Sequence, residues 1–177
     1  DFAKSHPEIP FVIDSVIFAT ADSQLLSDAG VEKMKAGLLS LARIATPNLP
    51  EAEALLGRPV RNADELAAAP RQLSELYGCS FLVKGGHFSE GDVITDYAWI
   101  EGEQIPFSHP RIDVADTHGT GCTLSAAICA NLAMKKPLKD SVGEGIAYLT
   151  RCLGQQYQWH RNGDMIAALN HFPDGVE

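Results

Sequence analysis

A glycine-rich turn in the second half of the chain carries the clearest chemical signal in the sequence. The segment DTHGTGCT places Gly119, Thr120 and Gly121 directly before the apolar helix pattern LSAAICANLA. Glycines let the backbone curl so that successive N–H groups point inward, and a helix N-terminus adds unpaired donors and the positive end of a dipole. Such donors stabilise the charge on a phosphate in transfer. The turn therefore predicts an anion hole; the alternative is a tight strand-to-helix turn without a ligand.

Cys122 lies at the start of the helix that this turn opens. That setting lowers the pKa of a thiol from about 8.5 and favours the thiolate. Cys122 could then take a proton from a substrate hydroxyl, whereas the alternative is a buried, inert thiol such as we expect for Cys129 inside the helix. The neighbouring His118 could donate to a substrate or cap the turn. The sequence spacing defines no Cys–His–Asn arrangement, so it does not favour a cysteine hydrolase.

The segment TPNLPE places Asn48 and Glu51 where a predicted strand ends and a predicted helix begins. Ligands of open α/β sheets collect beyond the carboxyl ends of strands. There an Asn amide with a carboxylate one turn later could hold hydrated Mg²⁺ near phosphates, with Glu51 acting through water. The alternative is helix capping by Asn48 with Glu51 as the third helical residue.

Two further candidates also follow predicted strands. Lys84 and Gly85 open the segment KGGH, where an ammonium and backbone donors could contact polyphosphate oxygens. Asp14 ends the first strand and could be an acidic metal ligand or only a polar strand terminus. Alone, each of these two segments is weak evidence of a phosphate site. The evidence is stronger when they lie at the same carboxyl-end edge of the sheet as the other motifs.

Apolar β-rich runs alternate with helical patterns along the chain, which predicts an α/β fold, a mostly parallel sheet with helices on both faces. The predicted strands are Pro10 to Ile17, Arg43 to Thr46 and Ser80 to Val83, with an antiparallel hairpin of Val93 to Ile100 and Glu103 to Phe107. The predicted helices are Ser27 to Leu41, Pro50 to Gly57, a helix capped by Asn62 or Asp64 and running to about Leu76, the helix after Gly121, and Leu138 to Gln155. We expect Asn48, Lys84 and Gly119 to face one cleft.

Composition bounds the possible functions. The 177 residues fit one domain, and 45% hydrophobic with 21% charged residues is an ordinary globular balance. Lys and Arg number 14 against 23 Asp and Glu, a formal net charge of -9, so a nucleic-acid partner is not expected. No apolar stretch approaches the roughly 20 residues that cross a bilayer, so no membrane partner is expected either.

The four cysteines form no CxxC pair and have no histidine at zinc-ligand spacing. Neither a structural zinc nor a disulfide framework is indicated. Cys79 and Cys152 lie in apolar surroundings, where a free thiol behaves as a small hydrophobe, which fits a reducing compartment. We therefore expect a cytoplasmic protein.

Taken together and in this order, the segments VIDSV, TPNLPEAEALLG, LVKGGH and DTHGTGCTLSAAI resemble the hydroxymethylpyrimidine phosphate kinases of the ribokinase-like superfamily. The resemblance runs from about Phe11 to about Ala147. It implies ATP and Mg²⁺ as cofactors, with Cys122 as the catalytic base and the turn from Gly119 to Gly121 as the anion hole. Asn48 and Glu51 match an NxxE motif that organises Mg²⁺ and phosphate, while Asp14 is a further metal candidate.

For nucleotide contact the resemblance implies Lys84, which matches the ATP-contacting lysine after a strand, with Thr117 and Gly85 beside the two motifs. The implied reaction is ATP-dependent phosphorylation of hydroxymethylpyrimidine or its monophosphate in thiamine biosynthesis. The partner would be an aminopyrimidine alcohol or its phosphate. Two alternatives stay open: a pyridoxal or pyridoxine kinase, and a catalytically silent nucleotide-binding module.

The sequence departs from the family pattern in two places. Ser15 stands where the family usually has Pro, and Phe18 to Asp22 replace a Lys-containing loop. The family's N-terminal strands and most of its pyrimidine pocket have no counterpart before Asp1. We therefore expect a single domain truncated at its N-terminus that is not an efficient kinase alone and that tends to self-associate, with a homo-oligomer as one outcome.

Overall fold

The computed structural model describes residues 2–18, 24–86, 88, 91–113, 118–161 and 164–175. Its strands are β1 (Val12–Ile13), β2 (Ile44–Ala45), β3 (Ser80–Val83), β4 (Val93–Ile100), β5 (Glu103–Pro110), β6 (Tyr157–Arg161) and β7 (Asp164–Ala168). Its α-helices are α1 (Phe2–Ser5), α2 (Asp28–Lys33), α3 (Leu49–Leu56), α4 (Ala63–Tyr77), α5 (Thr120–Ala133) and α6 (Leu138–Gly154). The fold class is α/β, as the sequence predicts.

Five strands form one sheet in the order β1-β2-β3-β4-β5. The pairs β1–β2 and β2–β3 are parallel, whereas β3–β4 and β4–β5 are antiparallel. The expectation of a mostly parallel sheet is therefore wrong, because the predicted hairpin joins the sheet as two full strands. Its turn uses Glu101 and Gly102, both with positive φ (53° and 86°), which matches the right-handed twist of the paired strands.

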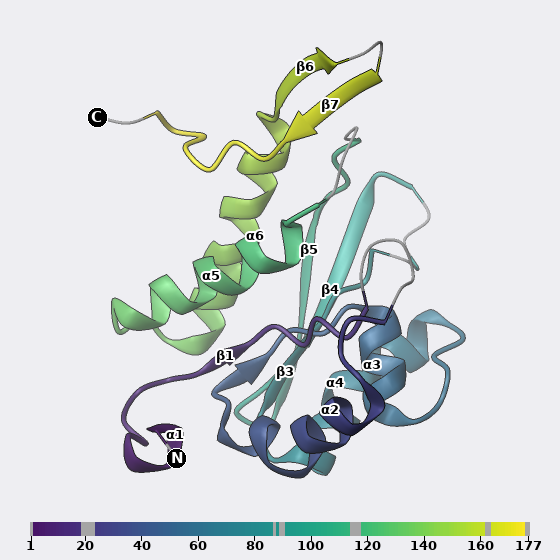
Figure 1. The fold of residues 1–177 in the computed structure, drawn as a ribbon, viewed down its shortest axis with the longest axis vertical. Helices are drawn as coiled ribbons and strands as arrows, with labels where there is room; N and C mark the ends of the chain where they lie inside the picture. The colour runs from purple at the N-terminus through teal and green to yellow at the C-terminus, as the bar shows by residue number, and fades with distance from the viewer. Residues whose placement is uncertain are drawn as a thin grey trace.

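Helices cover both faces of the sheet, as predicted (Figure 1). On one face α2, α3 and α4 pack against alternate strand residues such as Ala45, Phe81 and Val83. On the other face α5 and α6 pack against Ile44 and Leu82. Because successive strand side chains point to opposite faces, each central strand serves both cores. The two buried cores fix the sheet, and with it the positions where the strands end.

The helix ends follow their sequence signals. Asn62 caps α4 by accepting from the N–H of Glu65, and Gly78 ends that helix with a φ of 76°. Gly57 ends α3 in the same left-handed conformation (φ 70°), which glycine adopts without strain. The predicted helix from Ser27 to Leu41 is irregular, because α2 continues as a π-helix (Met34–Leu38) and a 3₁₀ turn (Leu39–Leu41).

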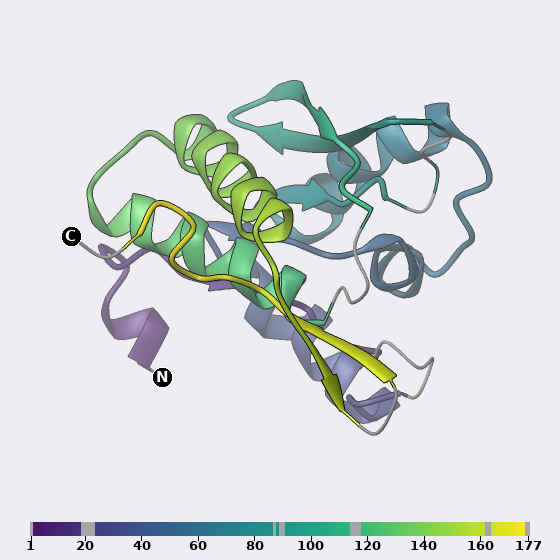
Figure 2. The same ribbon diagram turned by 90° about the horizontal axis from the view of Figure 1, so that it is seen from above.

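The sequence analysis missed the hairpin β6–β7, which follows α6 and forms a two-stranded sheet of its own. It stands apart from the five-stranded sheet in both ribbon views (Figures 1 and 2). Tyr157 and Trp159 of β6 are exposed, and the C-terminal tail returns to α6, where the Tyr148 hydroxyl donates to the carbonyl of His171 (2.8 Å). Among the described residues, no helix has both the length and the apolar character needed to cross a membrane.

Candidate active site

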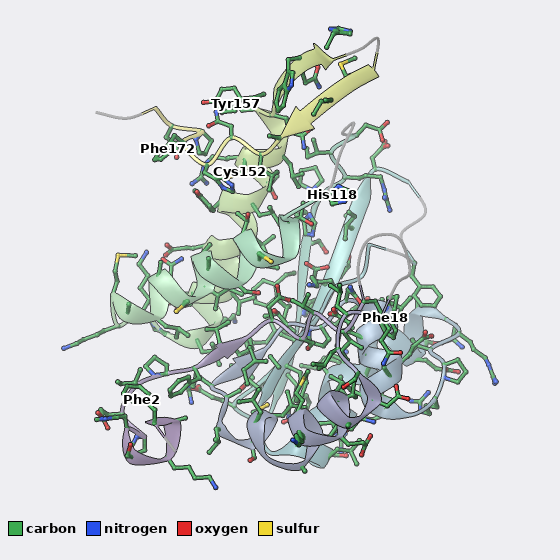
Figure 3. All side chains as sticks on the ribbon, viewed as in Figure 1. Phe2, Phe18, His118, Cys152, Tyr157 and Phe172 are labelled. Carbon is green, nitrogen blue, oxygen red and sulfur yellow. The ribbon has the colours of Figure 1, made fainter. Side chains whose placement is uncertain are left out.

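A cleft of about 550 Å³ opens where β1, β2 and β3 end and where α5 begins. The predicted site residues that line it are Asp14, Asn48, Glu51, Lys84, Gly119, Thr120, Gly121 and Cys122. The two remaining predicted site residues are Gly85 and Thr117, and Thr117 lies outside the described residues. Phe18, labelled in Figure 3, also lines the cleft, and His118 directly precedes the turn. The expectation that three separate loops face one cleft is therefore confirmed.

Lys84, Asp14 and Gly121 meet at the centre of this cleft. The ammonium of Lys84 lies 3.9 Å from Oδ1 of Asp14, and both side chains are mostly buried. A Cβ atom on Gly121 would lie 3.2 Å from the Lys84 Nζ and 3.6 Å from Oδ2 of Asp14. The absence of a side chain at Gly121 therefore lets a lysine and a carboxylate approach the first turn of α5.

The N-terminus of α5 has the geometry expected of an anion site. Gly119 is the N-cap residue, its φ of 81° is left-handed, and it offers no side chain to satisfy the first N–H groups of the helix. Those groups carry the positive end of the helix dipole, and Lys84 adds a full positive charge beside them. Together they could stabilise a phosphoryl group whose charge increases in the transition state.

Cys122 is exposed and lines the cleft, but its electrostatics differ from the prediction. Burial raises the pKa of its thiol, and the charge of Asp14 and a hydrogen bond to it raise that pKa further, against a smaller lowering by Lys84. The predicted lowering of the pKa is therefore wrong, because burial of the thiol and the carboxylate of Asp14, which follows β1, raise the pKa. Cys129, expected to be buried, is exposed, whereas Cys79 and Cys152 are buried as expected.

Asn48 and Glu51 form the capping box that was the alternative reading of their motif. The Asn48 side chain accepts from the Glu51 N–H (3.0 Å), and Oε2 of Glu51 accepts from the Asn48 N–H (2.9 Å). Oε1 of Glu51 accepts from the N–H of Ile17 (3.1 Å), so one carboxylate joins the start of α3 to the segment after β1. Burial raises the pKa of Glu51, while its hydrogen bond from Asn48 lowers it.

The strand β1 is shorter than predicted, and the segment that follows it is more constrained. The predicted strand from Pro10 to Ile17 is reduced to Val12–Ile13, because Val16 turns the chain with a φ of 30°. A β-branched residue at positive φ is strained, and such strain is characteristic of functional sites. Ser15 is buried, and its hydroxyl has no hydrogen-bond partner among the described residues. The turn leaves Val16 on the wall of the cleft.

Gly85, predicted to contact the nucleotide, has its backbone donor occupied within the protein. It is buried, and its N–H donates to Oδ1 of Asp96 at 2.8 Å, so that donor is not directed at a ligand. A Cβ atom at this position would lie 1.9 Å from the carbonyl oxygen of Thr95, which only glycine avoids. Gly85 is therefore a point of close backbone approach, and the adjacent Gly86 lines the cleft instead.

Sequence reasoning missed the far half of the cleft. Its polar part contains Asp96 and His109, from β4 and β5, and Arg111. Its apolar part contains Ile112, with Ile146, Leu149 and Leu153 from α6. Their types alone carry no signal, since alternating residues of a hairpin and the apolar face of a helix also occur in any core. Only the packing of β5 against α6 brings them together.

The acidic residues present fit a magnesium ion carried on a nucleotide better than a resident metal site. No group of three or more His, Cys, Asp or Glu side chains with metal-binding geometry occurs within the described ranges. Mg²⁺ usually keeps several waters and binds one or two carboxylates together with substrate phosphates. Asp14 and Glu51 supply that number of carboxylates on the wall of the cleft.

Comparison with known proteins gives the family of the chain. Residues 2–166 match the phosphomethylpyrimidine kinase family. The chain belongs to that family. The resemblance inferred from the four motifs is thereby confirmed.

Individual relatives agree with this assignment. The chain is 40% identical over 163 residues to the hydroxymethylpyrimidine/phosphomethylpyrimidine kinase of Salmonella typhimurium, covering 91% of this chain and 60% of that protein. It is 33% identical over 172 residues to the enzyme of the same name from Staphylococcus aureus, covering 97% of this chain and 61% of that protein. The chain thus spans about three fifths of the length of these relatives.

Among solved structures, an ADP complex of Bacillus subtilis pyridoxal kinase shares the fold. Its TM-score is 0.79 at 23% identity, covering 96% of this chain and 63% of that chain. At this identity the likeness establishes the architecture alone.

Proposed function

We propose that this chain is the nucleotide- and phosphate-handling part of a kinase that transfers the γ-phosphoryl group of ATP to hydroxymethylpyrimidine or its monophosphate, for thiamine biosynthesis. The observation that carries the proposal is the meeting of Lys84 and Asp14 at Gly121, on the N-terminus of α5. Phosphoryl transfer depends mainly on positioning and on stabilising charge, and this is the chemistry that an ammonium and unpaired helix N–H groups supply.

The two halves of the cleft suit the two halves of ATP. The triphosphate would lie at the polar end, against Lys84 and the turn from Gly119 to Gly121. The base would lie at the apolar end, against Ile112 and the α6 side chains Leu149 and Leu153. Ligand sites of this size usually combine an apolar wall with a few placed polar groups. Asn48 would contribute through the capping box, which fixes the loop facing the phosphates.

Mg²⁺ would be held by Asp14, with Glu51 acting through water, and would neutralise charge on the phosphate oxygens. The carboxylate of Glu51 is 3% exposed and already accepts two backbone N–H groups, which makes an outer role more suitable than direct ligation. Asp14 is less constrained and stands beside Lys84 at the point where the phosphates would enter.

Cys122 is our candidate for the group that accepts the proton of the acceptor hydroxyl. It lines the cleft on the first turn of α5 and is exposed. Its thiol must lose a proton before it can act as a base, and burial, with the neighbouring Asp14, raises the pKa that governs this loss. The thiolate fraction, and with it the rate, should therefore increase with pH.

The choice of acceptor is supported by the relatives at 33–40% identity, which bear the name of hydroxymethylpyrimidine/phosphomethylpyrimidine kinases. The test is to supply hydroxymethylpyrimidine, its monophosphate and pyridoxal side by side, with ATP and Mg²⁺, and to measure ADP formation. The proposal predicts turnover of a pyrimidine substrate in preference to pyridoxal. Preference for pyridoxal would assign a vitamin B6 kinase. ATP binding without any turnover, measured in the full-length protein, would assign a silent nucleotide-binding module.

Because the chain spans about three fifths of its relatives, the same assay should compare it with a longer form that includes the upstream genomic sequence. We expect the longer form to turn over faster, because acceptor positioning supplies much of the catalysis. Self-association is proposed for this span, since β1 is an edge of the sheet and Phe2 and Ile9 near it are exposed. A reducing compartment such as the cytoplasm is proposed from the four free cysteines.

A further inference from the structure

Asp96 is a buried carboxylate that binds two different segments of the cleft wall. Its residue is 4% exposed, on the central antiparallel strand β4. Oδ1 accepts from the N–H of Gly85 at 2.8 Å, and Oδ2 lies 3.3 Å from Nε2 of His109 on β5. A buried carboxylate needs such donors, because desolvating a charge without hydrogen bonds costs a large free energy.

The donor at Gly85 matters because it belongs to the peptide that follows Lys84. The N–H of Lys84 itself donates to the carbonyl of Pro47 at 3.1 Å. The Lys84 backbone is therefore held on both sides, by the loop after β2 and by Asp96. Gly85 also lies so close to Thr95 that a Cβ atom would be 1.9 Å from its carbonyl oxygen, which leaves the turn little room to shift.

We propose that Asp96 is a positioning residue for Lys84: its carboxylate fixes the backbone that follows Lys84 and joins it to His109, so that the ammonium stays directed at the phosphate end of the cleft. This inference rests on the proposed function, because it assigns Asp96 a part in nucleotide binding through Lys84. Asp96 lines the cleft, but both of its carboxylate oxygens are bonded within the protein, so it would act on the nucleotide through Lys84.

The bond between Asp96 and His109 strengthens this arrangement. It raises the pKa of His109 although burial of the ring lowers it, so the imidazolium form that donates to the carboxylate is favoured. A charge-assisted hydrogen bond of this kind is about twice as strong as a neutral one. Since His109 also lines the cleft, one carboxylate orients a cation on each side of it.

The test is a double-mutant cycle on affinity for ADP with Mg²⁺, measured by calorimetry on the parent chain, Lys84→Ala, Asp96→Ala and the double variant. We expect Lys84→Ala to weaken binding about 10-fold or more and Asp96→Ala about 5-fold, with the double variant within about 2-fold of Lys84→Ala alone, because contacts in one network are not additive. Asp96→Asn keeps an acceptor for the Gly85 N–H and should restore affinity to within about 2-fold of the parent.

Ser108→Ala is the matched control, because it removes a hydrogen bond between the same two strands, which joins Thr95 Oγ1 and Ser108 Oγ (3.0 Å) on an exposed surface. It should leave affinity unchanged. If thermal melting shows that Asp96→Ala is not folded, it is replaced in the cycle by Asp96→Leu. Leucine fills the buried volume but offers no acceptor. If the losses of affinity in Lys84→Ala and Asp96→Ala multiply in the double variant, this inference alone is overturned. Parental affinity of Asp96→Ala or Asp96→Leu would overturn it as well. Parental affinity of Lys84→Ala would overturn the proposed site as well.

Discussion

The Lys84 ammonium and the Asp14 carboxylate, which come from the ends of β3 and β1, lie 3.9 Å apart against the first turn of α5. They are held there because Gly121 presents no side chain to either of them. An opposite charge at this distance keeps both side chains extended into the cleft in the absence of a ligand. A phosphate that enters the cleft then meets the Lys84 ammonium and the first N–H groups of α5 already in place, which lowers the entropy cost of binding.

The first prediction concerns Gly121. Gly121→Ala should weaken ATP binding and lower turnover, each by on the order of 10-fold, because a Cβ atom 3.2 Å from Nζ displaces Lys84 from the phosphate position. Isothermal titration and a coupled kinase assay measure the two effects. Gly37→Ala is the control, since no atom of the described residues lies within 4 Å of the added methyl group. Equal ATP affinity and turnover of Gly121→Ala and Gly37→Ala would mean that Lys84 does not act at this position.

The second prediction separates the two glycines after Lys84. Gly85→Ala should lower the free energy of unfolding by at least about 2 kcal/mol, because its Cβ atom would overlap the carbonyl oxygen of Thr95. For Gly86→Ala, no described atom lies within 4 Å of the methyl group, so this variant should stay within about 0.5 kcal/mol of the parent. Urea denaturation of both variants measures the difference. A Gly85→Ala variant as stable as Gly86→Ala would contradict the close approach of this turn to β4.

The third prediction concerns Cys122 and pH. In the full-length protein, Cys122→Ala should lower the turnover number by about 10²–10⁴, with a much smaller change in nucleotide affinity, because a base acts mainly in the transition state. The pKa of the thiol is raised, so the thiolate increases as pH increases, and the parental turnover number should increase with it on the alkaline side of neutrality. Measured pH–rate profiles should show this increase in the parent and not in the variant. If the variant has the parental turnover number, Cys122 is not the base and has only a packing role.

Local signals in the sequence were sufficient to predict several elements. The strand Ser80–Val83 is found with the predicted bounds, and Asn62 and Gly78 bound α4 as their types predict. The convergence of three loops on one cleft also followed from the sequence, because it depends only on strands ending at the same edge of a sheet. Even the hairpin β6–β7 had a signal, the Asn-Gly pair at positions 162 and 163, which is typical of hairpin turns.

What the sequence could not predict depends on contacts between distant segments. The pKa of Cys122 is raised partly by Asp14 of the β1 end, a neighbour that a motif around Cys122 does not contain. The role of Gly85 depends on how closely β4 passes, and the role of Asp96 depends on the pairing of β4 with both β3 and β5. Each of these is a tertiary contact, which residue type and spacing do not encode.

The most direct test of the central claim is protection of Cys122 by nucleotide. Cys122 and Cys129 are both exposed on α5, but only Cys122 lines the cleft, so Cys129 is an internal control in the same helix. The chain is treated with iodoacetamide, with and without saturating ATP and Mg²⁺, and alkylation at each cysteine is measured by mass spectrometry. The account predicts that ATP slows alkylation of Cys122 several-fold and leaves Cys129 unchanged. If Cys122 is alkylated at the same rate with and without saturating ATP, the account is contradicted. The account is also contradicted if ATP does not bind and the alkylation rate stays unchanged at every ATP concentration.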